Sequence, residues 1–324
     1  MTALVQSTID RHGLDSHEHA LLTLLQALQE QDYRFTTCTP ATHARVNARA
    51  SNAQADSLAG VFGWSRPFTE ALLTPSLLAQ MKAAQVLEMQ SGLHHSGVRV
   101  SSLGDQLLLH SAFPTGAADA VFFGPDSYRF ARAIQAFLRQ PQARPIKRVA
   151  DIGCGAGPGA LSVALARPDA EVLALDINPT ALQYTRVNAA FAAAENVHVQ
   201  HSNLLNDVSG EFDLIVANPP YMADAERRAY RDGGGELGLG LTNAIVEASL
   251  SRLATGGSLL LYSGVAITAA GDPFAAWLQR QLDDRQWCWS YEELDPDVFG
   301  EELDQPGYEG VERIAAVQLI LTRR

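Results

Sequence analysis

The 324-residue chain has a formal net charge of −12, and 47% of its residues are hydrophobic. This length suits a large domain with a smaller one, and no run of about 18 apolar residues predicts a membrane span. The first ten residues lack the pattern of a secretory signal, and the three cysteines lie far apart without metal-ligand spacing. We therefore expect a cytoplasmic protein without a structural disulfide or a metal site. The acidity disfavours a surface built for nucleic-acid phosphates, although a local basic groove stays compatible with it.

The first third of the chain has the pattern of helices followed by a small hairpin. Helices are predicted over residues 16–31, after Pro40, over 52–60 and over 74–88. Thr74 is expected to cap the last of these, with Pro75 at its first position. Two strand-like runs then flank a Gly-Asp turn within residues 98–110. Together they predict an N-terminal helical, winged-helix-like unit over residues 1–115.

A winged helix raises the possibility of DNA binding. Between Ser51 and Gln90, however, only Arg66 and Lys82 are basic. A recognition helix is normally richer in lysine and arginine. We therefore favour substrate selection or simple packing as the role of this unit, with DNA binding as the alternative.

From Lys147 onward, strand-like and helical runs alternate along the chain. Strands are predicted from residues 148, 171, 197, 212, 257, 287 and 315, and helices from near residues 159, 179 and 242. This alternation is typical of a mostly parallel sheet with helices on both faces. Residues 116–324 are therefore expected to form an α/β, Rossmann-like domain with a seven-stranded sheet.

A glycine-rich turn, Asp151-Ile-Gly-Cys-Gly-Ala-Gly-Pro-Gly, follows the first predicted strand of this domain. Its glycines allow a tight turn and close approach of a ligand to the backbone, although they could also serve only to turn the chain. The spacing differs from the G-x-G-x-x-G that holds a pyrophosphate in dinucleotide enzymes. A carboxylate at Asp151 would repel a pyrophosphate but suits a cationic ligand. S-adenosyl-L-methionine, with a sulfonium and an amino group, is such a ligand.

Residues after the next two strands complete a nucleoside site. Asp176 ends the second strand, where such folds place an acid that accepts the ribose hydroxyls. Asn203 can offer an amide to the adenine edge. S-adenosyl-L-methionine is therefore the expected cofactor, with S-adenosyl-L-homocysteine as product. The predicted cofactor contacts are Asp151, Gly153, Cys154, Gly155, Gly157, Asp176, Ile177, Asn203, Leu204 and Asn218.

The fourth strand runs into Asn218-Pro219-Pro220-Tyr221, four residues that we predict to be catalytic. Two prolines end strand pairing and force a rigid, extended loop. The Asn218 side chain and the Pro219 carbonyl can then accept both hydrogen bonds of an NH2 group, and Tyr221 can stack on a flat substrate. Because the nitrogen becomes more acidic as it is alkylated, positioning and electrostatics are enough and no strong base is needed. A purely structural loop is the alternative.

From about Val121 the chain resembles class I S-adenosylmethionine-dependent methyltransferases, and its NPPY tetrad is similar to that of the HemK/PrmC family. That family methylates a glutamine of peptide release factors, and related NPPY enzymes methylate base amino groups in DNA and ribosomal RNA. The resemblance implies cofactor contacts at Asp151, Gly153, Gly155, Asp176 and Asn203 and substrate contacts at Asn218, Pro219 and Tyr221.

The chain departs from the HemK/PrmC pattern in three places. Phe123-Gly-Pro-Asp-Ser-Tyr-Arg-Phe stands where the family has a Pro-Arg-Pro-Glu-Thr-Glu-like box, a glycine-rich stretch follows Arg231, and residues 295–312 form a long acidic segment. Because the box is expected to fold over the cofactor, Phe123, Tyr128 and Arg129 are predicted to contact substrate.

The leading hypothesis is N-methylation of an amide or amino nitrogen, with a protein glutamine as the favoured substrate. A base amino group in RNA or DNA and a small metabolite are alternatives with the same chemistry. A non-catalytic binding module is a fourth possibility, which the intact cofactor and NPPY motifs disfavour.

Overall fold

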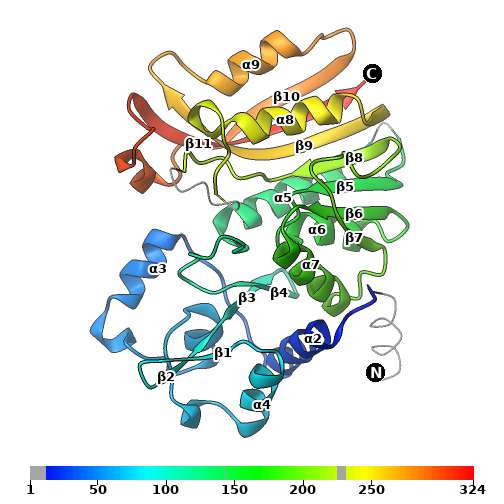
Figure 1. Ribbon diagram of the computed structural model, residues 1–324. Coiled ribbons are helices and arrows are strands. Elements are labelled where there is room, and N and C mark those ends of the chain that lie inside the picture. The colour runs from blue at the N-terminus through cyan, green and yellow to red at the C-terminus, as the bar shows by residue number, and fades with distance from the viewer. Residues whose placement is uncertain (1–11, 143, 225–230) are drawn as a thin grey trace.

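The computed structural model describes residues 12–142, 144–224 and 231–324 (Figure 1). Its N-terminal part contains three α-helices and two antiparallel hairpins within these residues. The helices are α2 (Ser16–Gln29), α3 (Pro40–Asn47) and α4 (Pro75–Ala83). The hairpins are β1 (Leu87–Gln90) with β2 (Leu93–Ser96), and β3 (Val98–Leu103) with β4 (Gln106–Ser111). Thr74 caps α4 as predicted, because its side chain accepts a hydrogen bond from the Leu77 amide.

Two of the predicted N-terminal helices are wrong in extent or kind. Residues 52–60 form no α-helix, and a 3-10 turn (Ala50–Asn52) and a π-helical turn (Ala59–Gly63) stand in this region. The amide of Ala55 instead donates to the Pro67 carbonyl. The helix predicted to reach residue 88 ends at Ala83, because Gln85 adopts a left-handed φ of 54° and the following residues pair as β1. The unit therefore has a second hairpin that the sequence pattern did not indicate.

The C-terminal part is built on one seven-stranded sheet, as the sequence predicts, in the order β10-β11-β9-β8-β5-β6-β7. The strands are β5 (Arg148–Ile152), β6 (Glu171–Asp176), β7 (Val197–His201), β8 (Phe212–Ala217), β9 (Leu253–Thr268), β10 (Trp287–Asp295) and β11 (Val311–Arg323). β5 to β9 are mutually parallel, whereas β11 pairs antiparallel with both β9 and β10. The chain leaves β5 in one direction and β8 in the other, and this reversal opens a crevice at their carboxyl ends.

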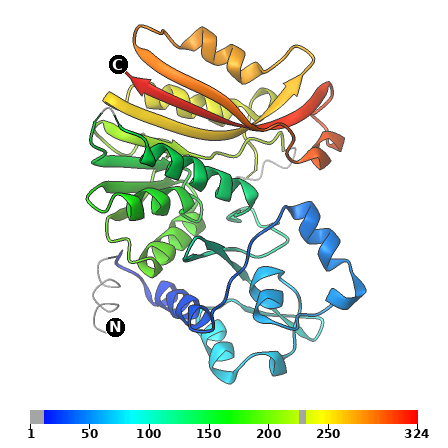
Figure 2. The same ribbon diagram turned by 180° about the vertical axis from the view of Figure 1, so that it is seen from behind.

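Helices cover both faces of the sheet. Neighbouring strand residues point to opposite faces, and both sets are apolar, so each face is buried under helices. The helices are α5 (Pro125–Arg139), α6 (Pro158–Ala166), α7 (Pro179–Phe191), α8 (Gly240–Leu250) and α9 (Pro273–Gln281). Val149 packs in the cluster that contains α5 and α6 side chains, whereas Ala150 packs with α8 and α9. Figure 1 shows α8 in front of the sheet, and Figure 2 shows α5 in front of the opposite face.

The N-terminal unit packs mainly on α7. A shared apolar cluster joins α2 and α4 to Ala181, Tyr184 and Val187 of that helix. Glu18 is buried in the contact and pairs with Arg186 at 2.7 Å. This packing also places β4 against α7, where the Asn188 side chain bonds to both backbone groups of Leu109.

None of the described helices is long and apolar enough to cross a membrane. The described residues also contain no group of three or more histidine, cysteine, aspartate or glutamate side chains able to hold a metal ion.

Candidate functional site

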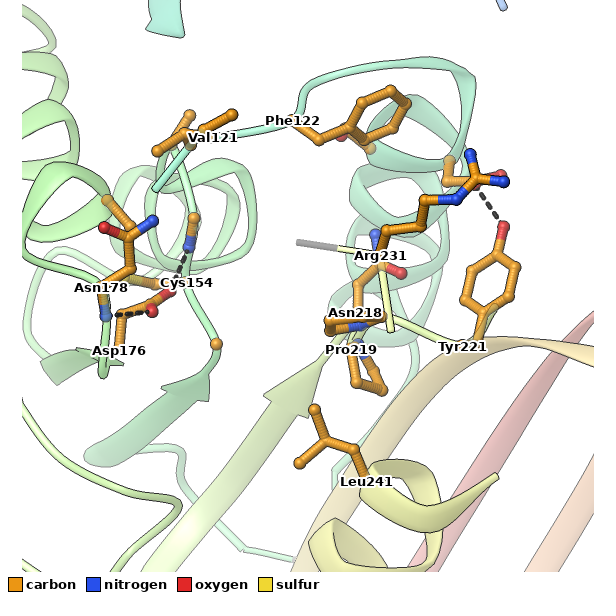
Figure 3. A pocket seen from close by; sticks show the side chains of 18 of the residues that line it. Val121, Phe122, Cys154, Asp176, Asn178, Asn218, Pro219, Tyr221, Arg231 and Leu241 are labelled. Atoms are coloured by element: carbon orange, nitrogen blue, oxygen red, sulfur yellow. Dashed lines mark hydrogen bonds between the residues drawn. The ribbon is translucent and has the colours of Figure 1, made fainter. Parts of the chain in front are cut away.

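A cavity of about 420 Å³ lies at the carboxyl ends of β5, β6 and β8. Its volume falls in the range of small-molecule and cofactor sites. Figure 3 shows Asp176 and Asn178 on one side and Asn218, Pro219 and Tyr221 on the other, with Phe122 over them. The crevice created by the strand order therefore brings the two sequence motifs to opposite walls of one cavity.

The glycine-rich turn forms the floor between β5 and α6. The amides of Gly153 and Cys154 donate to the Leu175 carbonyl at 2.8 and 2.9 Å, which fastens the turn to β6. Gly153 has a φ of 70°, and a side chain there would point into open space. Gly155 and Cys154 also line the cavity, whereas Gly157 lies beneath it against Thr185. The backbone at Gly153 is thus open to close approach by a ligand.

Asp151 is buried beneath this turn and lines the cavity. One carboxylate oxygen accepts a hydrogen bond of 2.7 Å from the Ala160 amide in the first turn of α6. Burial raises the pKa of this carboxyl to about 7; the Ala160 amide opposes the rise, and the nearby Asp176 adds to it. A cation bound beside Asp151 would favour its ionised form.

Asp176 is held in a fixed orientation at the end of β6. Its two oxygens accept hydrogen bonds from the amides of Gly155 (3.0 Å) and Asn178 (2.9 Å), and burial raises its pKa (Figure 3). The next residue, Ile177, lines the cavity with an unusually exposed apolar side chain, 55% accessible. An oriented acid beside an open apolar surface fits a ribose and its base.

Residues that follow β7 also belong to this wall. Ser202, Asn203 and Leu204 follow β7 and all line the cavity. Asn178 lines it as well, although the sequence pattern did not single it out. Its side chain caps α7 by accepting from Thr180 and donates to the Asp119 carbonyl, so it has a clear structural task.

The tetrad Asn218-Pro219-Pro220-Tyr221 follows β8, and all four residues line the opposite wall. The Tyr221 hydroxyl donates a hydrogen bond of 2.5 Å to Asp126, and its ring lies flush against Gly264 of β9. Burial and the Asp126 carboxylate raise the pKa of Tyr221 well above its usual value, which keeps the hydroxyl protonated. Tyr221 as a whole is only 8% exposed and forms part of the wall.

The three residues predicted to contact substrate lie outside the cavity lining. Phe123 is buried against His110, the Tyr128 hydroxyl accepts a hydrogen bond from the Thr37 amide, and Arg129 pairs with Asp126 and Asp295. Their neighbours line the cavity: Phe122, Asp126, Ser127 and Phe130. Because α5 begins at Pro125, helical periodicity places Asp126 and Phe130 on the side that lines the cavity and Tyr128 on another side. Arg129, three residues after Asp126, bonds to that carboxylate but does not line the cavity itself.

Residues from both parts of the chain complete the lining of the cavity. Pro40, at the start of α3, and residues 113–115 after β4 contribute from the N-terminal unit, and Gly116 follows directly. Phe299 and Arg231 contribute from the C-terminal part, and Arg231 pairs with Glu302 and Asp224. The sequence marked the stretch from Arg231 and residues 295–312 as departures from the family pattern, but it did not single out Pro40 or residues 113–116. Only the fold brings all of them to the cavity.

Residues 127–268 match the family model described as Methyltransferase small domain. The chain is 40% identical over 124 residues to the release factor glutamine methyltransferase of Deinococcus radiodurans. This alignment covers 35% of this chain and 44% of that protein. It is 33% identical over 141 residues to the enzyme of the same name from Escherichia coli, covering 40% and 50%. The chain thus spans about half the length of the curated relatives it matches.

Among solved structures, a ribosomal protein L11 methylase from Lactobacillus delbrueckii subsp. bulgaricus aligns with 20% identity and a TM-score of 0.40. The alignment covers 61% of this chain and 79% of that one. The fold itself is defined by the strand order described above.

Proposed function

We propose that this protein transfers a methyl group from S-adenosyl-L-methionine to the side-chain amide nitrogen of a glutamine in a protein substrate. The observation that carries the proposal is the arrangement of the two walls. The oriented acid Asp176 and the open glycine turn lie across one cavity from Asn218 and Pro219. The names of the relatives support glutamine as the acceptor.

The residues of the first wall fit the cofactor. Asp176, with its two oxygens fixed, would accept the ribose hydroxyls, and Ile177 would cover one face of the adenine. Asn203 and Leu204 would contact the edge of the adenine. Asp151 would stabilise the positively charged groups of the cofactor near the glycine turn. When bound, S-adenosyl-L-methionine supplies an electrophilic methyl group and leaves as S-adenosyl-L-homocysteine.

The residues of the second wall would orient the acceptor. The Asn218 side-chain oxygen and the Pro219 carbonyl would each accept one N–H of the amide, which directs the nitrogen lone pair toward the first wall. These acceptors also stabilise the positive charge that develops on nitrogen as the N–C bond forms. The surplus proton then leaves the more acidic, methylated nitrogen for water, so positioning accounts for the catalysis.

We further propose that the N-terminal unit, residues 1–115, selects the substrate. Pro40 and Phe113 of this unit line the same cavity as Asn218. A substrate whose side chain occupies that cavity would therefore lie close to the N-terminal unit.

The test is methyl transfer from isotopically labelled S-adenosyl-L-methionine to a purified peptide release factor and to lysate from cells that lack the protein. We expect label in the protein fraction, on glutamine by mass spectrometry. Asn218→Ala should abolish transfer and leave cofactor affinity nearly unchanged, whereas the exposed Asn206→Ala is the matched control. Label confined to nucleic acid or small molecules would refute the glutamine assignment, and a fully active Asn218→Ala would refute the mechanism.

A further inference from the structure

Asp126 lies in the first turn of α5, outside both sequence motifs, yet it joins the NPPY turn to the sheet. Asp126 is buried, with 4% of the residue exposed. One oxygen accepts a hydrogen bond from the Tyr221 hydroxyl at 2.5 Å. The other accepts from the Tyr262 hydroxyl at 2.7 Å and from the Arg129 guanidinium at 3.1 Å. A buried carboxylate with donors on both oxygens forms strong, charge-assisted hydrogen bonds.

The partners of Asp126 come from separate elements. Tyr262 lies in the middle of β9, and Arg129 also pairs with Asp295 at the end of β10. The tyrosine rings are anchored independently of these bonds, because Tyr262 is fully buried in the core of the sheet. Asp126 therefore ties the Tyr221 hydroxyl to rigid strands.

When Tyr221 is held in place, the rest of the NPPY turn (Asn218 to Tyr221) is held in place as well. Its ring packs on Gly264 and contacts Phe299 edge-on, with ring centroids 6.3 Å apart. Two prolines with restricted φ angles separate this residue from Asn218. A shift of Tyr221 would consequently be passed to the Pro219 carbonyl and the Asn218 side chain rather than absorbed between them.

We infer that Asp126 is a positioning residue for methyl transfer, which acts through Tyr221 to hold the two acceptors of the NPPY turn in place. This inference rests on the proposed function. Burial and the Asp126 carboxylate raise the pKa of both Tyr221 and Tyr262, so both hydroxyls stay protonated and remain donors. Asparagine at position 126 would break the arrangement, because an amide has one acceptor oxygen and cannot receive both tyrosines and the guanidinium.

The kinetic test compares Asp126→Asn, Tyr221→Phe and the double variant in the methyl-transfer assay. We expect each single change to lower kcat about 10- to 100-fold, the effect of losing a hydrogen bond to a charged group. Cofactor KM and Kd should stay within about twofold, because Asp126 acts on the acceptor side. The double variant should be scarcely slower than either single one, since both changes break the same contact. Asp126→Glu should restore part of the rate.

A matched control is Tyr291→Phe. Tyr291 lies on the same sheet but outside the cavity lining, and its hydroxyl donates a similar hydrogen bond to Asp272 at 2.6 Å. This change should leave kcat unchanged. If Asp126→Asn fails to fold, Tyr262→Phe keeps the carboxylate and removes only one of its donors, and a fall in kcat at constant cofactor Kd is again expected. Wild-type kcat in the soluble Asp126 variant, or in Tyr262→Phe if that alone folds, would overturn the inference. Losses that multiply in the double variant would also overturn it.

An equilibrium measurement separates this inference from the proposed function, because it needs no activity. In denaturant unfolding, Asp126→Asn, Tyr221→Phe and the double variant form a cycle, and the loss of unfolding free energy in the double variant should be smaller than the sum of the two single losses. If wild-type protein transfers no methyl group but this non-additivity appears, the proposed function fails and the Asp126 contact stands. If the two single losses add up in the double variant, the contact is refuted whatever the activity.

Discussion

Replacing Gly264 with alanine should displace the Tyr221 ring and slow catalysis without weakening cofactor binding. A Cβ at this position would lie 2.1 Å from Cε2 and 2.3 Å from Cδ2 of the tyrosine. Ordinary contact begins at 3.4 Å, so the ring must retreat by about 1.3 Å or the strand must yield. The φ angle of Gly264 lies outside the left-handed region, so the backbone itself accepts alanine. The perturbation is therefore purely steric.

The expected magnitudes follow from that displacement. Overpacking of this kind destabilises by about 1–3 kcal/mol. A displacement of about 1 Å in a positioned group can reduce the rate about 100-fold. We therefore expect kcat to fall by roughly that factor while the cofactor Kd stays the same, since Gly264 does not line the cofactor wall.

The assay combines methyl transfer, calorimetric cofactor binding and thermal unfolding for Gly264→Ala. The control is Gly300→Ala, at an exposed glycine without positive φ where the nearest neighbour of a Cβ is 3.8 Å away. The control should match wild type in all three measurements. A Gly264→Ala enzyme that is folded and has wild-type kcat would refute the claim that the position of Tyr221 limits the reaction.

Two substitutions and one change of pH test other parts of the molecule. Asp176→Ala should weaken S-adenosyl-L-homocysteine binding at least about tenfold by calorimetry, because the ribose would lose a charged acceptor; an unchanged Kd would remove Asp176 from the cofactor site. Burial raises the pKa of Asp151 to about 7. Between a pH of about 4 and about 7, the folded protein therefore keeps a proton that the unfolded chain has released. The free energy of unfolding consequently falls as the pH rises through this range. A bound cation lowers that pKa, so cofactor binding near pH 6.5 should release a proton and tighten with rising pH; equal binding enthalpies in buffers of different ionisation enthalpy would contradict this. Asn188→Ala should cost about 2–4 kcal/mol in denaturant unfolding, because the buried amide bonds to the backbone of Leu109 and Ala156; a loss below about 0.5 kcal/mol would show that these bonds are replaced.

The wall that we propose for the cofactor, with Asp151, the glycine turn and Asp176, could be predicted because its sequence signals are local. Asp151 and Asp176 lie at the carboxyl ends of strands with a clear hydrophobic pattern, and the glycine turn follows the first of these strands directly. In a parallel sheet the carboxyl ends of the strands meet at one edge, so residues at such ends converge even though they are far apart in the chain. The same reasoning placed Asn203 and Asn218 at that edge.

The N-terminal unit was predicted less well because its structure depends on distant contacts. Residues 84–90 have the composition of a helix, yet the left-handed Gln85 and the pairing with β2 turn them into a hairpin. Residues 52–60 likewise give up helical hydrogen bonds for contacts such as Ala55 with Pro67. Helical propensity is a weak preference that such tertiary contacts override.

The sequence by itself determined the alternation of strands and helices, the two motifs and the edge of the sheet where they meet, because periodicity and turn chemistry act over a few residues. Tertiary structure decided which neighbours complete the site. Asp126 reaches Tyr221 across 95 residues of sequence and Tyr262 across 136. Gly264 provides the surface on which the Tyr221 ring lies. No spacing rule links these positions, because they come together only when α5 packs across β9 beside the cavity.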